Sequence, residues 1–138
     1  MVCQEIKDFL AAHADARYAA FVTSLMPGAR PVVGVLLPVL RALAKEIAKG
    51  DWRTYLEEAV DDTFEEVMLQ GYVTGAARMP FEEQMDRMTA YVRKINDWAL
   101  CDSPCSGFKF VRKHREEVWA FLQPYLYSGE VFSQRFAV

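Results

Sequence analysis

The spacing of apolar residues constrains the fold most, because they recur at intervals of three and four along most of the chain. Between residues 3 and 25 the positions at this spacing are Ile6, Phe9, Leu10, Tyr18, Phe21, Val22 and Leu25. This periodicity places apolar side chains on one face of a helix. Proline and glycine interrupt it at short intervals. The pattern therefore predicts an all-α protein made of many short helices.

The first two helices are predicted to be separated by an irregular connector. One helix is expected from Cys3 to Leu25, ending before Pro27 and Gly28. Residues 31–38 are apolar and long enough for a strand. They hold two prolines and a glycine, however, and so favour an irregular connector. Pro38 is expected to open a helix that runs to Lys49 and ends at Gly50.

Residues typical of helix starts predict the next three elements. Asp51 is a suitable N-cap for a short helix. Asp62 and Glu65 have the spacing of a capping box for a helix from about Thr63 to Ala77. Pro80 is expected to open a further helix, with acidic residues in its first turn.

The C-terminal third is predicted to hold three more helices. A helix is expected around Trp98 to Asp102, ending at Ser103 and Pro104. A long helix is expected from about Phe108 to Leu126, with Pro124 disturbing its last turn. Residues 130–138 start another amphipathic helix, which is too short to be stable unless it packs or continues. We therefore expect the chain to be the N-terminal part of a longer fold.

Helices in pairs joined by short connectors, at about 35 to 45 residues per pair, fit a helical-repeat solenoid better than a compact bundle. No Ser/Gly-rich linker divides the chain, so residues 1–138 are expected to form one domain. Since 52% of its 138 residues are hydrophobic, the chain can build a core. No stretch approaches the roughly 20 apolar residues that span a bilayer, which predicts a cytoplasmic protein without a membrane partner.

Charge and cysteine content narrow the function further. The net charge of -3 gives no overall attraction to nucleic acid, so DNA binding would need a local basic surface. Three cysteines at positions 3, 101 and 105, with no histidine nearby, indicate neither a disulfide framework nor a zinc site. His13 and His114 are interpreted as surface or half-buried helix residues.

Trp98 and Asp102 are four residues apart, so a helix would present both on one face. An aromatic face and a carboxylate could act together on a cationic ring. Two other interpretations stay open, because Asp102 could cap a helix that begins at Pro104 and Trp98 could pack in the core.

Seven basic residues could line a concave face and bind phosphates: Arg41, Lys45, Lys94, Lys109, Arg112, Lys113 and Arg115. The densest cluster lies between Lys109 and Arg115. A charge run on a helix is more often a solvated face, and Glu116 and Glu117 dilute this one.

Four blocks together resemble the N-terminal part of the bacterial DNA alkylation repair family, the HEAT-like-repeat DNA glycosylases that excise alkylpurines. The blocks are Gly34-Val35 with Pro38 and Leu40 to Ile47, Phe64 to Gly71, Asn96 to Asp102, and Phe132 to Val138. The resemblance implies a right-handed superhelix of antiparallel helix pairs. It implies a substrate of double-stranded DNA carrying N3- or N7-alkylated purines, attacked without flipping the base, and no metal or organic cofactor.

The resemblance also implies three residue roles. Asp102 matches the catalytic aspartate, Trp98 an aromatic that lines the lesion pocket, and Arg135 an arginine that holds the DNA backbone. Without the resemblance, Arg135 would be read as a solvated side chain.

The chemistry agrees with elementary principles. An alkylated purine is already cationic and leaves easily, so positive charge develops on the deoxyribose as the glycosidic bond lengthens. A fixed carboxylate such as Asp102 can stabilise that charge by about 3 kcal/mol. An indole such as Trp98 can add about 0.5 to 2 kcal/mol as a cation–π contact.

Two departures from the family pattern weaken the match. Leu36 stands where the pattern suggests an arginine, and the family's later repeats are missing. Two other functions therefore stay open. One is a non-catalytic helical-repeat module that binds protein or DNA. The other is a structural remnant that oligomerises through an apolar C-terminal face.

Overall fold

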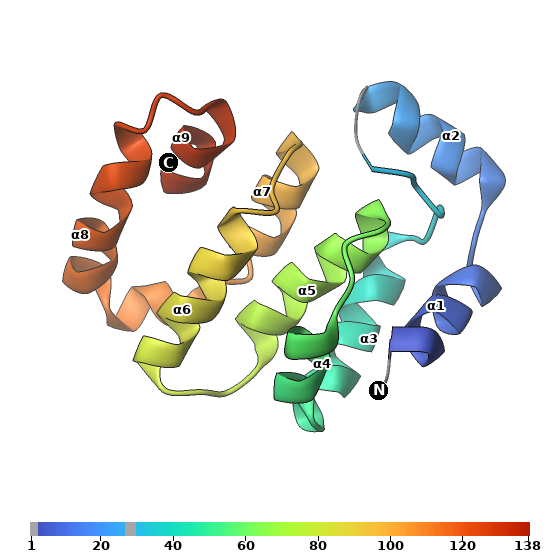
Figure 1. Ribbon diagram of the computed structural model, residues 1–138, viewed down its shortest axis with the longest axis horizontal. Coiled ribbons are helices and arrows are strands. Elements are labelled where there is room, and N and C mark those ends of the chain that lie inside the picture. Colours follow the sequence, from blue (N-terminus) through green and yellow to red (C-terminus); the bar gives the residue numbers. More distant parts are fainter. Residues whose placement is uncertain (1–2, 27–29) are drawn as a thin grey trace.

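The computed structural model describes residues 3–26 and 30–138, and these residues form helices and connectors without a strand (Figure 1). The helices described are α1 (Cys3–Ala12), α2 (Ala16–Leu25), α3 (Leu37–Lys49), α4 (Trp52–Glu58), α5 (Phe64–Ala76), α6 (Phe81–Val92), α7 (Trp98–Cys105), the 3-10 helix η1 (Lys109–Lys113), α8 (Arg115–Leu126) and α9 (Val131–Ala137). The all-α prediction is confirmed. In the part of the chain described, no helix is long and apolar enough to cross a membrane.

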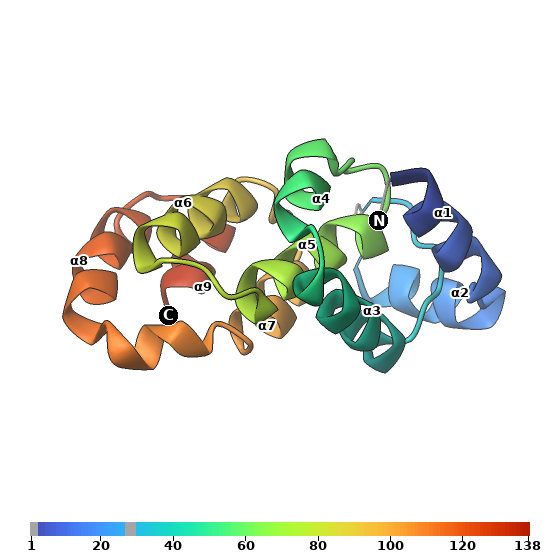
Figure 2. The same ribbon diagram turned by 90° about the horizontal axis from the view of Figure 1, so that it is seen from below.

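Alternate helices pack side by side along the molecule. Helix α3 packs on α5, α5 packs on α7, and α7 packs on α9. Helices α4, α6 and α8 pack against α3, α5 and α9 respectively, and Figure 2 shows α4 and α6 together on one side of α5. This arrangement brings α7, which carries Asp102, into contact with α9, which carries Arg135.

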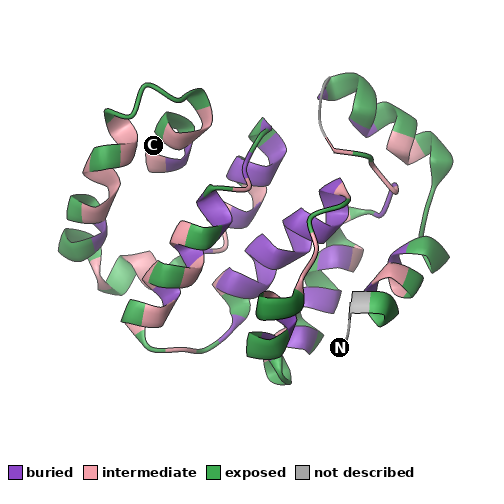
Figure 3. Cartoon of the chain, viewed as in Figure 1, coloured by how far each residue is buried: buried purple, intermediate pink, exposed green. Residues whose placement is uncertain are grey.

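Helix α5 lies at the centre of the core. Its residues from Phe64 to Thr74 are all buried, as the purple ribbon in Figure 3 shows. A helix that is buried on every side needs partners on every side, both for its apolar side chains and for its buried polar ones. Gly71 permits the closest of these contacts, since a Cβ atom there would lie 2.6 Å from the Tyr91 ring and 2.7 Å from Pro104.

The prediction of one helix from Cys3 to Leu25 was wrong, because Asp15 divides the segment. Its carboxylate accepts hydrogen bonds from the backbone N–H groups of Arg17 (2.9 Å) and Tyr18 (3.0 Å), so α2 begins at Ala16. An aspartate that bonds free N–H groups in this way favours a new helix start over continuation. Pro27 and Gly28, the predicted stop signal, lie outside the described residues.

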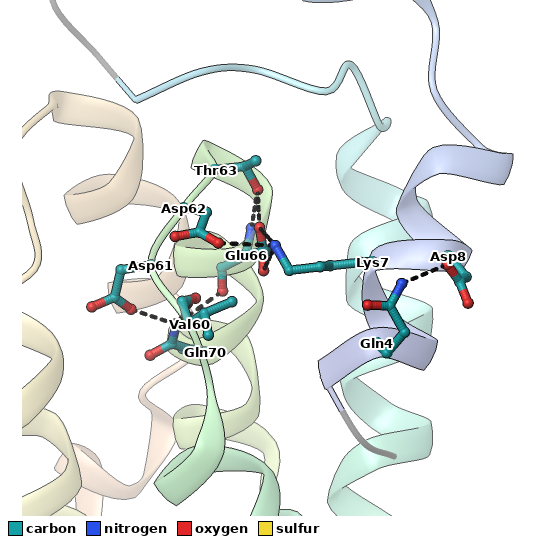
Figure 4. Close-up of polar contacts among 9 residues, drawn as sticks. All are labelled: Gln4, Lys7, Asp8, Val60, Asp61, Asp62, Thr63, Glu66 and Gln70. Atoms are coloured by element: carbon teal, nitrogen blue, oxygen red, sulfur yellow. Dashed lines mark hydrogen bonds and ion pairs between the residues drawn. The ribbon is translucent and has the colours of Figure 1, made fainter.

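The predicted capping box lies one residue further along the chain (Figure 4). Thr63, not Asp62, is the N-cap of α5: its hydroxyl accepts from the N–H of Glu66 at 3.2 Å and donates to the Glu66 carboxylate at 2.9 Å. Lys7 on α1 joins this end of α5, since its Nζ lies 3.0 Å from Asp62 and 3.4 Å from Glu66.

Glu65, the predicted partner in that box, instead fixes the connector. Its carboxylate is fully buried and accepts from the backbone N–H groups of Val33 (2.9 Å), Gly34 (2.9 Å) and Val35 (3.2 Å). The connector is therefore irregular, as predicted, but not loose. Gly34 has φ +95°, and a Cβ atom there would lie 2.1 Å from the backbone oxygen of Asp15.

Two predictions at the C-terminal end were wrong. Helix α7 does not end at Ser103 and Pro104 but continues to Cys105. Proline has no N–H to give to the carbonyl of Leu100, and the buried hydroxyl of Tyr91 donates to that carbonyl instead, at 2.6 Å. The expected long helix from Phe108 to Leu126 is divided into η1 and α8. The division falls at His114, whose ring stacks on Phe81 with 3.9 Å between ring centroids.

Candidate functional site

Asp97 fixes where α7, the helix that carries Trp98 and Asp102, begins. It is the N-cap of α7, and its Oδ1 accepts from the N–H of Leu100 at 2.8 Å. Burial raises the pKa of Asp97, while hydrogen bonds from the N–H groups of Leu100 and Ala99 act in the opposite direction. Trp98 is thus the first residue of the helix, and Asp102 follows one turn later.

Asp102 and Arg135 form a paired contact between α7 and α9. Arg135 Nε donates to Asp102 Oδ1 at 2.7 Å, and Arg135 Nη2 donates to Oδ2. These hydrogen bonds lower the pKa of Asp102 and keep it ionised. Both side chains stay accessible, with exposed fractions of 44% for Asp102 and 46% for Arg135. No helix begins at Pro104, so the alternative that Asp102 caps such a helix is wrong.

Asp102 and Arg135 line a pocket between α7, η1, α8 and α9 with a volume of about 550 Å³. Its walls are mostly apolar and include Val118, Leu122 and Phe136. Arg112, predicted as a DNA-backbone contact, faces this same pocket. A charged pair thus lies beside an apolar surface that is large enough to cover part of a sugar or a base.

Two cysteines line the same pocket, and the sequence reasoning assigned them no role. Cys101 and Cys105 are one turn apart on α7 and both line the pocket. The neighbouring Cys105 thiol lowers the pKa of Cys101, and the same contact raises the pKa of Cys105. Both thiols are free.

Trp98 is not a core residue. Its side chain is 42% exposed on the same helix as Asp102, one turn before it, although it does not line the Asp102 pocket. An exposed indole beside an ionised carboxylate remains available to a ligand.

Three predicted DNA-backbone residues gather in a second pocket, of about 510 Å³, here called the Arg41 pocket: Arg41, Lys45 and Lys109. Arg41 donates to Ser103 Oγ at 3.3 Å and lies 5.4 Å from the centroid of the Tyr72 ring. Ser106 lines both this pocket and the pocket of Asp102, so the two pockets are neighbours.

The remaining predicted contacts lie elsewhere. Lys113 lines a third pocket, which it shares with Lys109. Lys94 is already bonded to Asp61 at 3.0 Å and to Gln70 at 2.6 Å. Leu36, where the family pattern suggests arginine, is exposed at the start of α3. Within the described ranges no three His, Cys, Asp or Glu side chains are placed to hold a metal ion.

Residues 6–138 match the family model described as DNA alkylation repair enzyme. The match covers nearly the whole chain, and the chain therefore belongs to this family. No curated protein and no solved structure matches it.

Proposed function

We propose that this chain is the lesion-facing part of a DNA glycosylase that hydrolyses the N-glycosyl bond of purines alkylated at N3 or N7. The observation that carries this proposal is the Asp102–Arg135 pair. It places an ionised, half-exposed carboxylate at a pocket, bonded to a guanidinium that can also bind phosphate. The exposed Trp98 one turn away adds an aromatic face for a cationic base or its sugar.

The contact between Arg135 and Asp102 couples DNA binding to chemistry. A DNA phosphate offers Arg135 the same planar pair of acceptor oxygens that Asp102 offers it. When Arg135 turns to the phosphate, the Asp102 carboxylate becomes free to face the deoxyribose. The carboxylate thus becomes available once the backbone is in place.

The reaction then needs no general acid. The glycosidic bond breaks with its electron pair moving to the cationic purine, which leaves neutral. Positive charge develops on the sugar, and Asp102 stabilises it. Water adds to the anomeric carbon from the opposite face, and Asp102 or bulk water takes the released proton.

The basic pocket gives the DNA backbone a path beside the carboxylate. Arg41, Lys45 and Lys109 lie together next to Ser103, and we assign them to phosphates of the strand that carries the lesion. Arg112 lines the Asp102 pocket, and we assign it to the phosphate nearest the lesion. Lys94 is the least suited of the candidates to bind a phosphate, because Asp61 and Gln70 already accept hydrogen bonds from its ammonium group.

The row formed by α3, α5, α7 and α9 supports a HEAT-like superhelix, with further repeats completing the DNA-binding face. A chromosomal substrate would place the protein in the bacterial cytoplasm. The exposed apolar residues Trp119 on α8 and Val131 on α9 suit contact with such repeats or with a second copy.

The proposal is tested by release of 3-methyladenine and 7-methylguanine from methylated duplex DNA. Asp102→Asn keeps the shape and removes the charge, and we expect the single-turnover rate to fall by about 10²- to 10³-fold. Asp86→Asn, at an exposed carboxylate on α6, is the matched control and should leave the rate unchanged. Equal release by both variants, or no release by the parent chain, would contradict the proposal.

A non-catalytic DNA-binding module is the second candidate. The three cations of the Arg41 pocket, Arg41, Lys45 and Lys109, favour this function. Among the described residues none of them has a carboxylate partner. This function predicts DNA affinity without base release, and an affinity that Asp102→Asn does not change.

A further inference from the structure

We propose that a second basic pocket, here called the Arg78 pocket, holds the sugar–phosphate backbone of the DNA beyond the lesion. The pocket has a volume of about 530 Å³ and is defined by Arg78, Phe81, Lys109, Lys113 and His114. The proposal rests on the proposed function above only for the identity of the ligand, which is DNA. Arg78, Phe81 and His114 have no role in that function.

The charges of this pocket are uncompensated. Several cations elsewhere bond directly to carboxylates, as Arg53 does with Glu83 and Arg135 does with Asp102. Arg78, Lys109 and Lys113 have no such partner in the described structure, and no described carboxylate lines the pocket. Like charges gathered around one hollow repel each other, and an anion bound there relieves that repulsion.

The Arg78 pocket continues the path that begins beside the carboxylate. It shares Gly75, Ala76 and Lys109 with the Arg41 pocket. At the place where the two meet, Gly75 packs closely on the segment after α7, because a Cβ atom on Gly75 would lie 2.9 Å from the backbone oxygen of Gly107. One chain of phosphates can therefore pass from Arg41 over Lys109 to Arg78 and Lys113.

An aromatic wall suits the sugar part of that backbone. The rings of Phe81 and His114 are stacked, with 3.9 Å between centroids and an interplanar angle of 20°. This stack joins the start of α6 to the residue between η1 and α8. Cations at the rim and rings at one wall match a backbone that alternates phosphates with apolar sugar faces. Such contacts carry no base sequence information.

The test measures how the affinity for an undamaged, fluorescein-labelled 20-base-pair duplex depends on salt. Each phosphate contact adds about 0.9 to the slope of log K against log salt concentration. Arg78→Gln with Lys113→Gln should therefore lower the slope by about 2. The control double variant, Arg17→Gln with Arg93→Gln, removes two exposed cations without ion pairs from outside both pockets. It should lower the slope by much less.

Three readouts separate the outcomes. Equal slopes for the two double variants, at unchanged melting temperature, would overturn the proposal. A greater loss of affinity for deoxyadenosine monophosphate than for the duplex would also overturn it, in favour of a small-ligand pocket. If the slope falls as expected while the parent chain releases no alkylated base, the Arg78 pocket stands and the glycosylase proposal fails.

Discussion

Glu65 and Asp102 are both carboxylates that accept several hydrogen bonds from a distant segment, yet their surroundings differ. Glu65 is fully buried, and its donors are backbone N–H groups of the connector. Asp102 is half exposed, and its donor is the side chain of Arg135. A backbone donor cannot leave without unfolding the connector, whereas an arginine can turn to another anion. Burial and the kind of partner thus separate the structural acid from the candidate catalytic one.

The largest expected effect is at the structural acid. Glu65→Ala leaves three backbone N–H groups without an acceptor, and each such loss costs about 1 to 3 kcal/mol. We expect the free energy of unfolding, measured by urea denaturation, to fall by about 3 kcal/mol or more. Glu46→Ala, at an exposed acid on α3, should change it by less than about 0.5 kcal/mol. Equal effects of the two substitutions would show that the connector does not depend on Glu65.

The contrast between these acids marks what the sequence could and could not predict. Periodicity, proline and glycine predicted the helical class, and spacing predicted that Trp98 and Asp102 share a face. Spacing could not relate Asp102 to Arg135, because 33 residues separate them. The family resemblance implied a role for each residue but did not predict the contact between them.

The errors have a common physical origin. Asp62 and Thr63 are both good N-caps, and only the buried connector, which occupies Glu65, leaves Thr63 and Glu66 to form the box. Similarly, Pro104 ends a helix by local rules, but a tertiary contact from Tyr91 lets α7 continue. Local signals predicted the presence of the helices, and long-range hydrogen bonds set several of their ends.

Trp98→Leu tests whether the exposed indole belongs to the functional side of this contrast. Loss of a cation–π contact of about 0.5 to 2 kcal/mol predicts a release rate about 2- to 30-fold lower on methylated DNA. Trp119 on α8 is 65% exposed, and Trp119→Leu is the matched control, with no expected change in rate. A similar loss for both variants would indicate a general effect of removing surface tryptophan.

Asp97 combines features of both acids, since it is buried like Glu65 and is the N-cap of α7, the helix that also carries Asp102. Asp97→Ala removes the cap of α7 and should lower the free energy of unfolding by about 1 kcal/mol. Asp97→Asn keeps an acceptor and should cost less. Because burial raises the pKa of Asp97, its contribution to stability is complete below the ordinary aspartate pKa of 3.8 and is lost as the pH rises through the higher value. Urea unfolding across the acidic range should show this dependence in the parent and not in Asp97→Asn.

The smallest expected effect, a change in the pKa of Asp102, tests most directly whether its partner can be exchanged. Arg135 holds that pKa below 3.8, so its stabilising effect is present above 3.8 and is lost as the pH falls through the lower value. In an NMR titration of ¹³C-labelled aspartate, Arg135→Gln should raise the pKa of Asp102 toward its ordinary value. Saturating undamaged duplex should raise it in the parent as well, because a phosphate takes Arg135 and adds negative charge nearby. If DNA leaves this pKa unchanged, the guanidinium stays on the carboxylate and the contact is as fixed as that of Glu65. A pKa that rises yet stays well below neutral leaves the carboxylate ionised and free, which is the state that charge stabilisation on the sugar requires.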